Sequence, residues 1–401
     1  MKPALSVKLV NRLILNNNII DKKIRAKEIT DIVEVTTKNE DWKYVPLQSD
    51  INNLELGKNT DLENTHGFHV NANGNNFNIN HEVDGVIFTD LVDIETPVID
   101  ESIKRPVDKF LFQQFTRATG GFRIDINEDI VDYLKINFES KKNTIPYVGI
   151  NVNKNKSAKF FINFSDLVKS NIYPLIEIYL DVNSNLELII QVTTSHEINL
   201  INSLYAKLEK DSGLSIHTVS TGGVFSRSRM DIDLIGNGSN FNIDGVYFGE
   251  NNQVLDNRVF VNHLGKNTTS KMQTKGVLGD ESTSIFTGTI HIAEGATKTE
   301  SHQENRNILL SKKASAQSVP NMEILCDDVI CGHGSSVGPI DENLYHYVMS
   351  RGITKEKAEK LLIKGFFNEV INKPSWNIIN SEVASQLFKK YENVLERSNN
   401  G

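Results

Sequence analysis

Hydrophobic and polar residues alternate with a period of two along most of the chain between residues 66 and 335. Phe122, Ile124 and Ile126, for example, are separated by polar residues. Alternation of this kind, bounded by Gly, Asn and Ser, is typical of short strands with one buried face. The same reasoning predicts strands over 134–138, 159–164, 176–182, 186–193, 230–234, 246–248, 258–262, 285–292 and 322–330.

Helices are predicted at only one place within this stretch, over 199–210, because Leu200, Leu204 and Leu208 follow a helical spacing. A doubly wound α/β sheet needs helices between its strands, so it does not fit. A short motif that begins at Phe77-Asn78-Ile79 returns over 241–248. Many short strands with Asn and Gly corners fit either a β-helix or a β-sandwich, and the weak repeat favours the β-helix.

The character of the sequence becomes helical after Pro339. A first helix carries Ile340, Leu344 and Val348 on one face, and Gly352 ends it. Thr354 is suited to cap a second helix, whose predicted inward residues are Ala358, Leu361, Leu362 and Phe366. A third helix is predicted from the spacing of Val383, Leu387, Phe388, Tyr391 and Leu395. A module of this size is too small to be stable alone. We therefore expect residues 339–401 to pack on the β core and to offer an apolar face to a partner.

The first 65 residues are polar and mixed. Broken apolar spacing over 8–35 predicts one or two short helices. The segment 41–47 places Trp42 and Tyr44 beside Pro46, which predicts an anchored turn. The expected organisation is thus a partly helical region over 1–65, a β-helix core over 66–338 and a helical domain over 339–401.

Composition narrows the class of protein. The chain has 401 residues, with 43 basic and 51 acidic side chains and a net charge of −8. An acidic chain is unsuited to grip nucleic acid, and no apolar run reaches the length of a membrane span. The N-terminus has no secretory pattern, and two cysteines are too few for a disulfide framework. We expect a cytoplasmic protein. The 46 asparagines reflect either a bias of the source genome or many turns between short strands, and both can hold.

Common catalytic motifs are absent from the sequence. It contains no G-x-x-x-x-G-K-[ST], G-x-G-x-x-G or HExxH pattern, which argues against an NTPase, dehydrogenase or zincin. Asp231 and Asp233 lie on one face of a predicted strand, as paired carboxylates do in some β-helical polysaccharide enzymes. The simpler interpretation of this pair is solvated surface.

One cluster has the chemistry of a site. The run from Cys326 to Gly334 holds two cysteines, two aspartates and His333, with glycines that permit a tight turn. Cysteine and histidine bind soft or borderline metals, but this spacing is not a closed four-ligand zinc pattern. The cluster is therefore either a structural turn with incidental cysteines or a site that shares ligands with another chain.

The residues around this cluster resemble the SufB/SufD family of iron–sulfur cluster assembly proteins. The resemblance is carried by 284–292, 303–310 and 322–338, continues through Asp341-Glu342 and 350–353, and is dense over about 220–372. Upstream, Trp42 with Tyr44, and Thr221-Gly222-Gly223 with Arg227, are similar to family elements. Where SufB-type chains carry Glu-His-Glu-Ala, this chain has Cys-Gly-His-Gly-Ser-Ser from Cys331, as in the SufD branch. Departures are the short N-terminal region and Val45, where the family often has Thr.

The resemblance implies a fold and partners. The expected fold is mainly β, with a right-handed parallel β-helix core, an N-terminal helical region and a small C-terminal helical domain. The expected role is that of a scaffold without its own catalytic turnover, which assembles with SufB and two copies of the ATPase SufC. Movement of SufC on the helical domains would shift the interface between the scaffolds.

The resemblance also implies roles for individual residues. His333, and with less weight Cys331, would lie at the SufB interface where a transient iron–sulfur cluster forms, and both are candidate metal ligands. Cys331 ranks second because the neighbouring Asp327 and Asp328 disfavour a thiolate. The segment 341–370 would dock SufC, with the candidate residues Asp341, Leu344, Arg351, Gly352, Ile353, Leu361, Leu362 and Phe366.

Two alternatives remain beside this interpretation. One is a homodimeric SufB-like protein that binds a cluster by itself, and a remote one is a carbohydrate-active enzyme that uses Asp231 and Asp233. We expect no cofactor on the isolated chain, and the sequence does not decide between an assembled complex with and without flavin.

Overall fold

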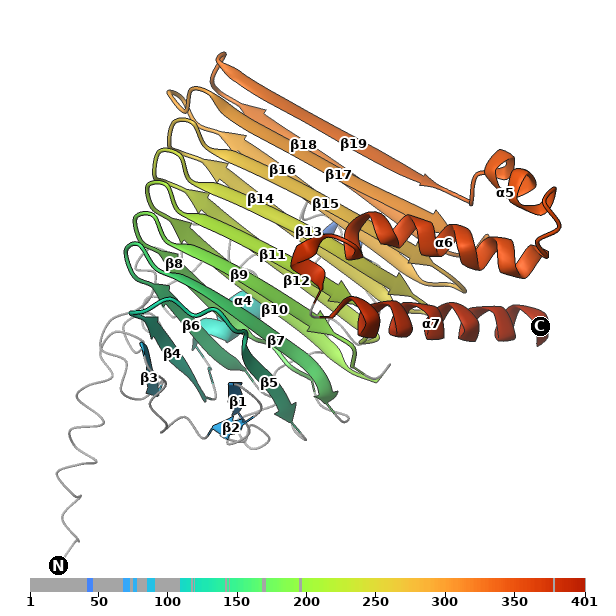
Figure 1. The fold of residues 1–401 in the computed structure, drawn as a ribbon, viewed down its shortest axis with the longest axis horizontal. Helices are drawn as coiled ribbons and strands as arrows, with labels where there is room; N and C mark the ends of the chain where they lie inside the picture. The colour runs from blue at the N-terminus through green and yellow to red at the C-terminus, as the bar shows by residue number, and fades with distance from the viewer. Residues whose placement is uncertain are drawn as a thin grey trace, which may run out of the picture.

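The computed structural model describes residues 42–45, 68–72, 75–77, 85–90, 109–116, 118, 120–140, 143, 145–167, 171–194, 197–377 and 379–400. Its strands form two long sheets that face each other (Figure 1). The ten-stranded sheet consists, in spatial order, of β19 (Val329–Gly338), β17 (Thr299–Leu309), β15 (Thr269–Leu278), β13 (Asn240–Gly249), β11 (Gly213–Ser220), β9 (Asn185–Val192), β7 (Ser157–Leu167), β5 (Leu134–Ser140), β1 (Phe68–Ala72) and β2 (Asn75–Phe77). The nine-stranded sheet consists of β18 (Ser315–Ile324), β16 (Thr283–Ile292), β14 (Val254–His263), β12 (Phe225–Leu234), β10 (Asn199–Leu208), β8 (Leu175–Leu180), β6 (Pro146–Val152), β4 (Gly120–Ile126) and β3 (Val86–Asp90).

From β4 onward the chain crosses from one sheet to the other after each strand, so that odd strands from β5 lie in one sheet and even strands in the other. Each strand from β4 onward pairs in parallel with the strand two further along, as β12 does with β14 from Phe225↔Val254 to Leu234↔His263. This is a β-solenoid of about seven turns. The predicted parallel β-helix is therefore confirmed.

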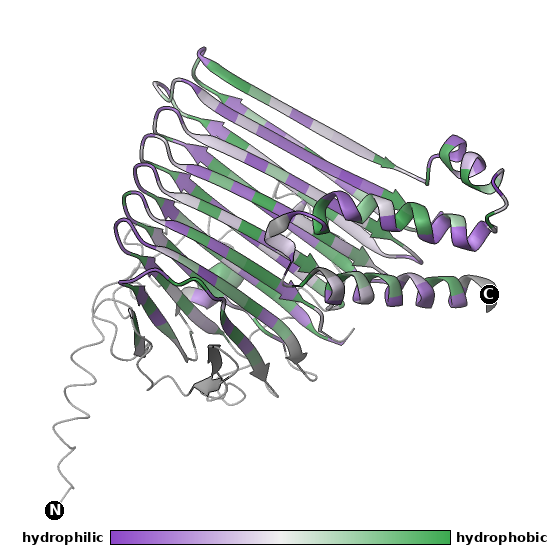
Figure 2. Ribbon diagram, in the orientation of Figure 1, coloured by the Kyte–Doolittle hydropathy of each residue, from purple (hydrophilic) through white to green (hydrophobic). Residues whose placement is uncertain are grey.

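The interior of the solenoid is filled by the alternating apolar residues. Figure 2 shows hydrophobic and hydrophilic positions alternating along the strands. One continuous cluster runs through the interior, from Phe122 and Ile124 on β4 to Ile290 and Ile292 on β16. Because a strand turns successive side chains to opposite faces, the period of two places one set of residues inside every turn.

Asparagine and aspartate make many of the corners. Several non-glycine residues adopt a positive φ there, among them Asn155, Asn183, Asp211, Asn251 and Asn267. Their short polar side chains tolerate the left-handed conformation. The amide of Asn183 also donates to Oδ1 of Asn155 one turn below, at 3.0 Å. The abundance of asparagine thus has a structural use in turns between short strands.

Two details of the predicted strands were wrong. The segment predicted as a helix over 199–210 is strand β10, because leucines four residues apart satisfy a period of two as well as a helical one. Its other face is buried too, since Ile201 packs in an apolar cluster outside the sheet. The strand predicted over 322–330 is two strands, β18 and β19, with a corner between Ile324 and Val329.

The outer face of the nine-stranded sheet is covered by α4 (Lys109–Thr116) and the turn at Trp42. Gln114 of α4 is buried and donates to the carbonyls of Pro174 and Ile201, at 3.0 and 2.9 Å. Trp42 lies against the guanidinium of Arg227, 3.8 Å from its ring centroid. The predicted anchored turn agrees with the described residues 42–45, whereas the helices predicted over 8–35 lie outside the described residues.

The C-terminal helices are α5 (Glu342–Met349), α6 (Lys355–Ile371) and α7 (Asn380–Asn400), with a 3₁₀ turn η3 (Pro374–Trp376) between the last two. α6 and α7 pack on the outer face of the ten-stranded sheet and share an apolar cluster with Val246, Phe248 and Val277. The module therefore packs on the β core, as predicted. None of the described helices is long and apolar enough to cross a membrane.

The buried face of α6 differs from the predicted one. Ala358 is buried as expected, but Leu361 is exposed, and Leu362 and Phe366 are half-buried. Ile363, Phe367 and Val370 take their place in the interface. Thr354 occupies the N-cap position, but its side chain makes no capping hydrogen bond.

Candidate functional site

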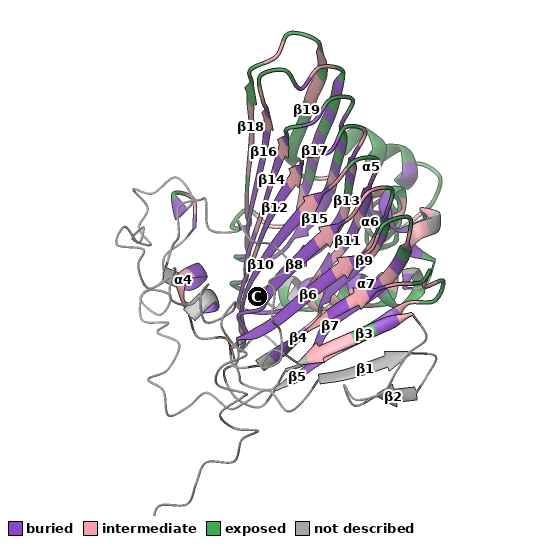
Figure 3. Cartoon of the chain, turned by 90° about the vertical axis from the view of Figure 1, so that its left-hand side faces the viewer, coloured by how far each residue is buried: buried purple, intermediate pink, exposed green. Residues whose placement is uncertain are grey.

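The last turn of the solenoid differs from the others in its exposure. The strands of the middle turns are mostly buried, whereas every described residue of β18 and β19 is at least partly exposed (Figure 3). β19 pairs with β17 and β18 with β16, and each forms the end of its sheet. The open end therefore presents two unpaired strand edges, which are surfaces suited to pairing with another chain.

Cys331 and His333 lie on this end strand. They are two residues apart and so share one face of β19, the face that continues the solenoid interior. Cys331 is half-buried and packs against the interior cluster, beside Ser301 on β17. His333 is exposed and pairs in register with Gln303. The sequence cluster is thus divided: Cys326, Asp327 and Asp328 form the corner, and Cys331 and His333 belong to the strand.

The Cys331 thiol has a raised pKa. The main cause is burial, which disfavours the charged thiolate, and a hydrogen bond with the backbone of Ser301 opposes it. The sequence analysis predicted the same direction but attributed it to Asp327 and Asp328. Burial rather than those carboxylates is the cause.

The interior beneath the open end is polar. Thr299, Ser301, Gln303, Asn305 and Asn307 of β17 all point inward and are buried. The Asn305 amide donates to Thr274 Oγ1 at 2.8 Å, and the Asn307 amide donates to Asn305 Oδ1 at 2.8 Å. Buried hydrogen bonds of this kind fix side-chain positions.

This polar network was not predicted from the sequence. The available signal was the run 299–307, in which polar residues occupy both faces of a strand. Such a run is ambiguous without knowledge of which face is buried.

The open end also exposes apolar side chains. Ile330 is 67% exposed, and Ile324, Leu325 and Val337 on the same two strands and their corner are exposed too. Exposed aliphatic side chains on unpaired edge strands favour contact with another protein.

The described residues at this end do not form a complete metal site. In the residues that the structure describes, no three His, Cys, Asp or Glu side chains are grouped so as to hold a metal ion. Cys331 and His333 can offer one sulfur and one nitrogen ligand, both of types that iron accepts. Further ligands would have to come from outside this group of residues.

The residues predicted to dock a partner form the outer part of the helical module. Asp341 caps α5, accepting from the backbone N–H of Asn343 at 2.8 Å, and Gly352 ends the turn after α5 with a φ of 84°. Leu344, Tyr347, Met349 and Leu361 are exposed, and the Arg351 guanidinium lies 4.3 Å from the Tyr347 ring centroid. Ile353 is half-buried.

Phe366 lies apart from this exposed group. It covers the ammonium of Lys275 on the ten-stranded sheet, at 4.6 Å from its ring centroid. Its place in the fold is therefore in the anchoring of α6.

The paired aspartates of β12 are committed to neighbours. Asp231 is buried and accepts from Arg229 Nε at 2.9 Å, and Asp233 accepts a hydrogen bond from the Asn262 amide. The interpretation of this pair as solvated surface was therefore wrong for Asp231. Carboxylates bound in this way are not available as an acid and base for polysaccharide cleavage.

The known family of sequences described as "SUF system FeS cluster assembly, SufBD core domain" matches residues 136–366, which is more than half of the chain. The chain belongs to the SufBD family. The matched segment includes the strands from β5 to β19 and the helix α5.

Several curated relatives agree with this assignment. An iron–sulfur cluster assembly SufBD family protein of Mycobacterium leprae (strain TN) is 35% identical over 181 residues, covering 43% of this chain and 46% of the relative. The iron–sulfur cluster assembly protein SufD of Escherichia coli (strain K12) is 32% identical over 163 residues, covering 41% and 38%. SufD of Bacillus subtilis (strain 168) is 35% identical over 158 residues, covering 39% and 36%. The matches span about half or less of the length of these relatives. The resemblance to SufD is thereby supported.

Proposed function

We propose that this chain is a non-catalytic, SufD-like scaffold of iron–sulfur cluster assembly. It pairs with a SufB chain through the open end of the solenoid and binds the ATPase SufC through the exposed part of the helical module. The observation that carries the proposal is the last turn, where two unpaired strand edges, exposed aliphatic residues and His333 occur together.

Pairing at this end would satisfy three separate needs. The free backbone groups of β18 and β19 would gain hydrogen-bond partners, and Ile330, Leu325 and Val337 would be removed from water. Cys331 and His333 would meet ligands from a second chain. The cluster is then a transient substrate held at the seam between the two scaffolds, with His333 the more accessible ligand.

SufC docking is supported by the shape of the helical module. Leu344, Tyr347 and Leu361 form an exposed apolar face that the solenoid leaves uncovered. α6 and α7, in contrast, are anchored on β13 and β15. A force applied by SufC at α5 and the start of α6 would therefore reach the same sheet that ends in β19.

The proposal is tested by co-expression with SufB and SufC of the same organism, followed by native mass measurement. The expected result is one complex that contains all three chains. Ile330→Asp should remove SufB because it places a charge in the apolar seam. Val131→Asp is the matched control, since Val131 is equally exposed, at 79%, but lies near the opposite end of the solenoid. Loss of SufB from neither variant, or from both, would contradict the proposed surface.

An SufB-like homodimer is the second candidate, because the same open end could pair with a second copy of the chain. Iron and sulfide reconstitution of the isolated chain separates the two. A stable chromophore on a dimer would favour the homodimer, and a colourless chain that joins SufB would favour the first proposal.

A further inference from the structure

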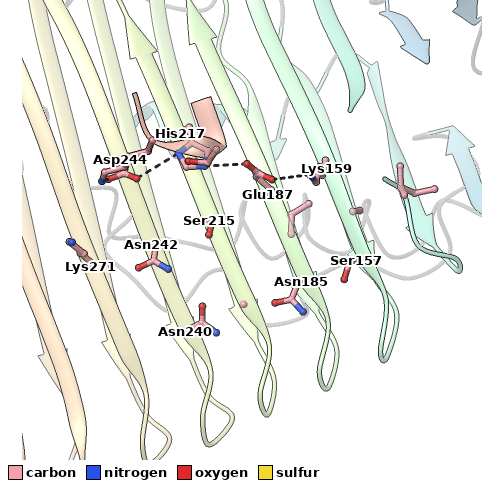
Figure 4. Close-up of a pocket in the computed structure, with 16 residues that line it drawn as sticks. Ser157, Lys159, Asn185, Glu187, Ser215, His217, Asn240, Asn242, Asp244 and Lys271 are labelled. Carbon is pink, nitrogen blue, oxygen red and sulfur yellow. Dashed lines mark hydrogen bonds and ion pairs between the residues drawn. The ribbon is translucent and has the colours of Figure 1, made fainter. Parts of the chain in front are cut away.

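A groove of about 520 Å³ lies on the outer face of the ten-stranded sheet, away from the open end. Figure 4 shows its floor, made by successive strands from β7 to β15. The turn between α6 and η3 closes one side through Lys373 and Ser375. A volume of this size accommodates a small organic molecule.

The floor is built by the solenoid register. One row across the strands runs Lys159–Glu187–Ser215–Asn242–Lys271, and the row beside it contains Asn185, Gly213 and Asn240. Each turn of the solenoid therefore contributes one hydroxyl, amide or charged group to the same flat surface. Gly213 lets the Asn185 and Asn240 side chains lie close over the sheet between them, because a Cβ there would lie 2.6 Å from Oδ1 of Asn185 and 3.0 Å from Nδ2 of Asn240.

His217 lies in the groove wall between two carboxylates. Its residue exposure is only 3%, and neither ring nitrogen has a hydrogen-bond partner among the described residues. Glu187 Oε1 is 3.6 Å from Nε2, and Asp244 Oδ2 is 3.9 Å from Nδ1, both longer than hydrogen bonds. The ring is held edge-on by Trp376, with centroids 5.6 Å apart.

The two carboxylates of the groove are already neutralised and oriented. Glu187 lies 3.5 Å from the ammonium of Lys159, and its pKa is lowered chiefly by the neighbouring His217. Asp244 accepts a hydrogen bond from Lys373. Lys271, in contrast, is exposed and has no ion-pair partner in the described part of the chain. Three lysines face two carboxylates here, so the groove is locally positive although the chain carries a net charge of −8.

Two ligand classes are disfavoured by the same geometry. Glu187 and Asp244 approach opposite nitrogens of His217, so one metal ion cannot bind all three. Among the described residues that line the groove there is no Phe, Tyr or Trp. A nucleobase or flavin ring would therefore lack a stacking surface.

We propose that this groove binds a small polyhydroxylated anion, which is a sugar that carries a phosphate or a carboxylate group. The asparagine amides and Ser215 bind the hydroxyl groups, and Glu187 and Asp244 accept from them. Lys271 binds the anionic group. The site is independent of the open end and of any role in cluster assembly.

The test is isothermal titration of the full chain with glucose 6-phosphate and with glucuronate, which separate a phosphate from a carboxylate as the anion. Glucose presents the hydroxyl groups without the anion, and inorganic phosphate presents the anion without the sugar. We expect at least one of the two sugar anions to bind with a stoichiometry of one, and each half alone to bind at least about tenfold more weakly.

Lys271→Ala should weaken that binding by about tenfold or more, since it removes a charge-assisted contact. Lys312→Ala is the matched control, an exposed lysine outside the groove, and should bind as the unaltered chain does. Both side chains are exposed, so the melting temperature without ligand should be unchanged. The proposal is overturned if neither sugar anion binds saturably, if inorganic phosphate binds as tightly as glucose 6-phosphate, or if Lys271→Ala binds normally.

Discussion

His263 shows how the solenoid interior acts on a single residue. It is buried at the end of β14, with Nδ1 2.8 Å from Thr268 Oγ1 and Nε2 2.9 Å from Ser270 Oγ. Burial lowers its pKa to about 4, and the nearby His291 adds to the shift. The folded state therefore holds a neutral ring at pH 7.

A pH dependence of stability follows from this shift. The folded pKa lies below the unfolded value of 6.5, so the stabilisation is complete above pH 6.5 and is lost as the pH falls toward 4. The loss from this residue between pH 7 and pH 4 should be about 3 kcal/mol. Urea unfolding of His263→Gln should show a smaller fall in stability over this range than the unaltered chain. His302→Gln, at an exposed histidine, is the control and should leave the fall unchanged.

A second prediction for a single residue concerns His333 as a ligand of the iron–sulfur cluster. His333→Ala in the co-expressed complex should lower the bound iron and sulfide several-fold while the subunits stay together, because an exposed ligand is lost without disturbing the fold. His302→Ala removes an exposed histidine from the neighbouring strand and should have no effect. Equal iron content in the two variants would show that His333 is not a ligand.

Candidate residues that lie close together in the sequence could be predicted, whereas residues brought together only by the fold could not. Cys331 and His333 stand in one local run, so their types and spacing could be recognised. His217 and Asp244 meet only because the solenoid stacks them, and Arg227 pairs with Asp256 across 29 residues of sequence. No local pattern contains such pairs.

At the scale of elements, the helical module is fixed to the sheet by buried ion pairs as well as by apolar contact. Glu250 is buried and accepts from Lys390 Nζ at 2.7 Å and from Arg397, both on α7. Lys275 of β15 pairs with Glu369 and donates to the carbonyl of Phe366 at 3.0 Å, both on α6. These contacts make α6 and α7 a rigid extension of the ten-stranded sheet.

Glu250→Ala should therefore loosen α7. The substitution leaves the largely buried Lys390 without its partner, which costs about 3 kcal/mol. Hydrogen–deuterium exchange should become faster over α7 and stay unchanged in β9 and β11. Glu392→Ala breaks an exposed pair with Lys360 and should have almost no effect. Similar exchange in the two variants would mean that apolar packing alone holds the helix.

The elements themselves were largely predictable from hydrophobic period, and the errors have physical causes. β10 satisfies both a helical and a strand period, and burial on both sides hides its alternation. Leu361 was predicted to lie on the buried face of α6, whereas Ile363 and Phe367 are the residues that pack against the sheet. The orientation of a helix depends on its neighbour, which its own sequence does not contain.

At the scale of the whole molecule, the solenoid repeat is clear in the stacking contacts but weak in the amino-acid sequence. Stacked partners are separated by 26 residues for Asn163 and Asn137, 28 for Asn183 and Asn155, and 31 for Ser301 and Ser270. Because the spacing drifts and the side chains vary, the sequence showed only one weak recurrence, of 77–79 at 241–243. The number of turns and the open end at β18 and β19 could be obtained only from the structure.

The central claim is that this open end, rather than another surface, joins a second scaffold chain. Hydrogen–deuterium exchange of the chain alone and with purified SufB tests it directly. Addition of SufB should slow exchange in β18 and β19, while β4 to β6 near the other end remain unchanged. Protection confined to β4–β6, or none in β19 despite a stable complex, would contradict it.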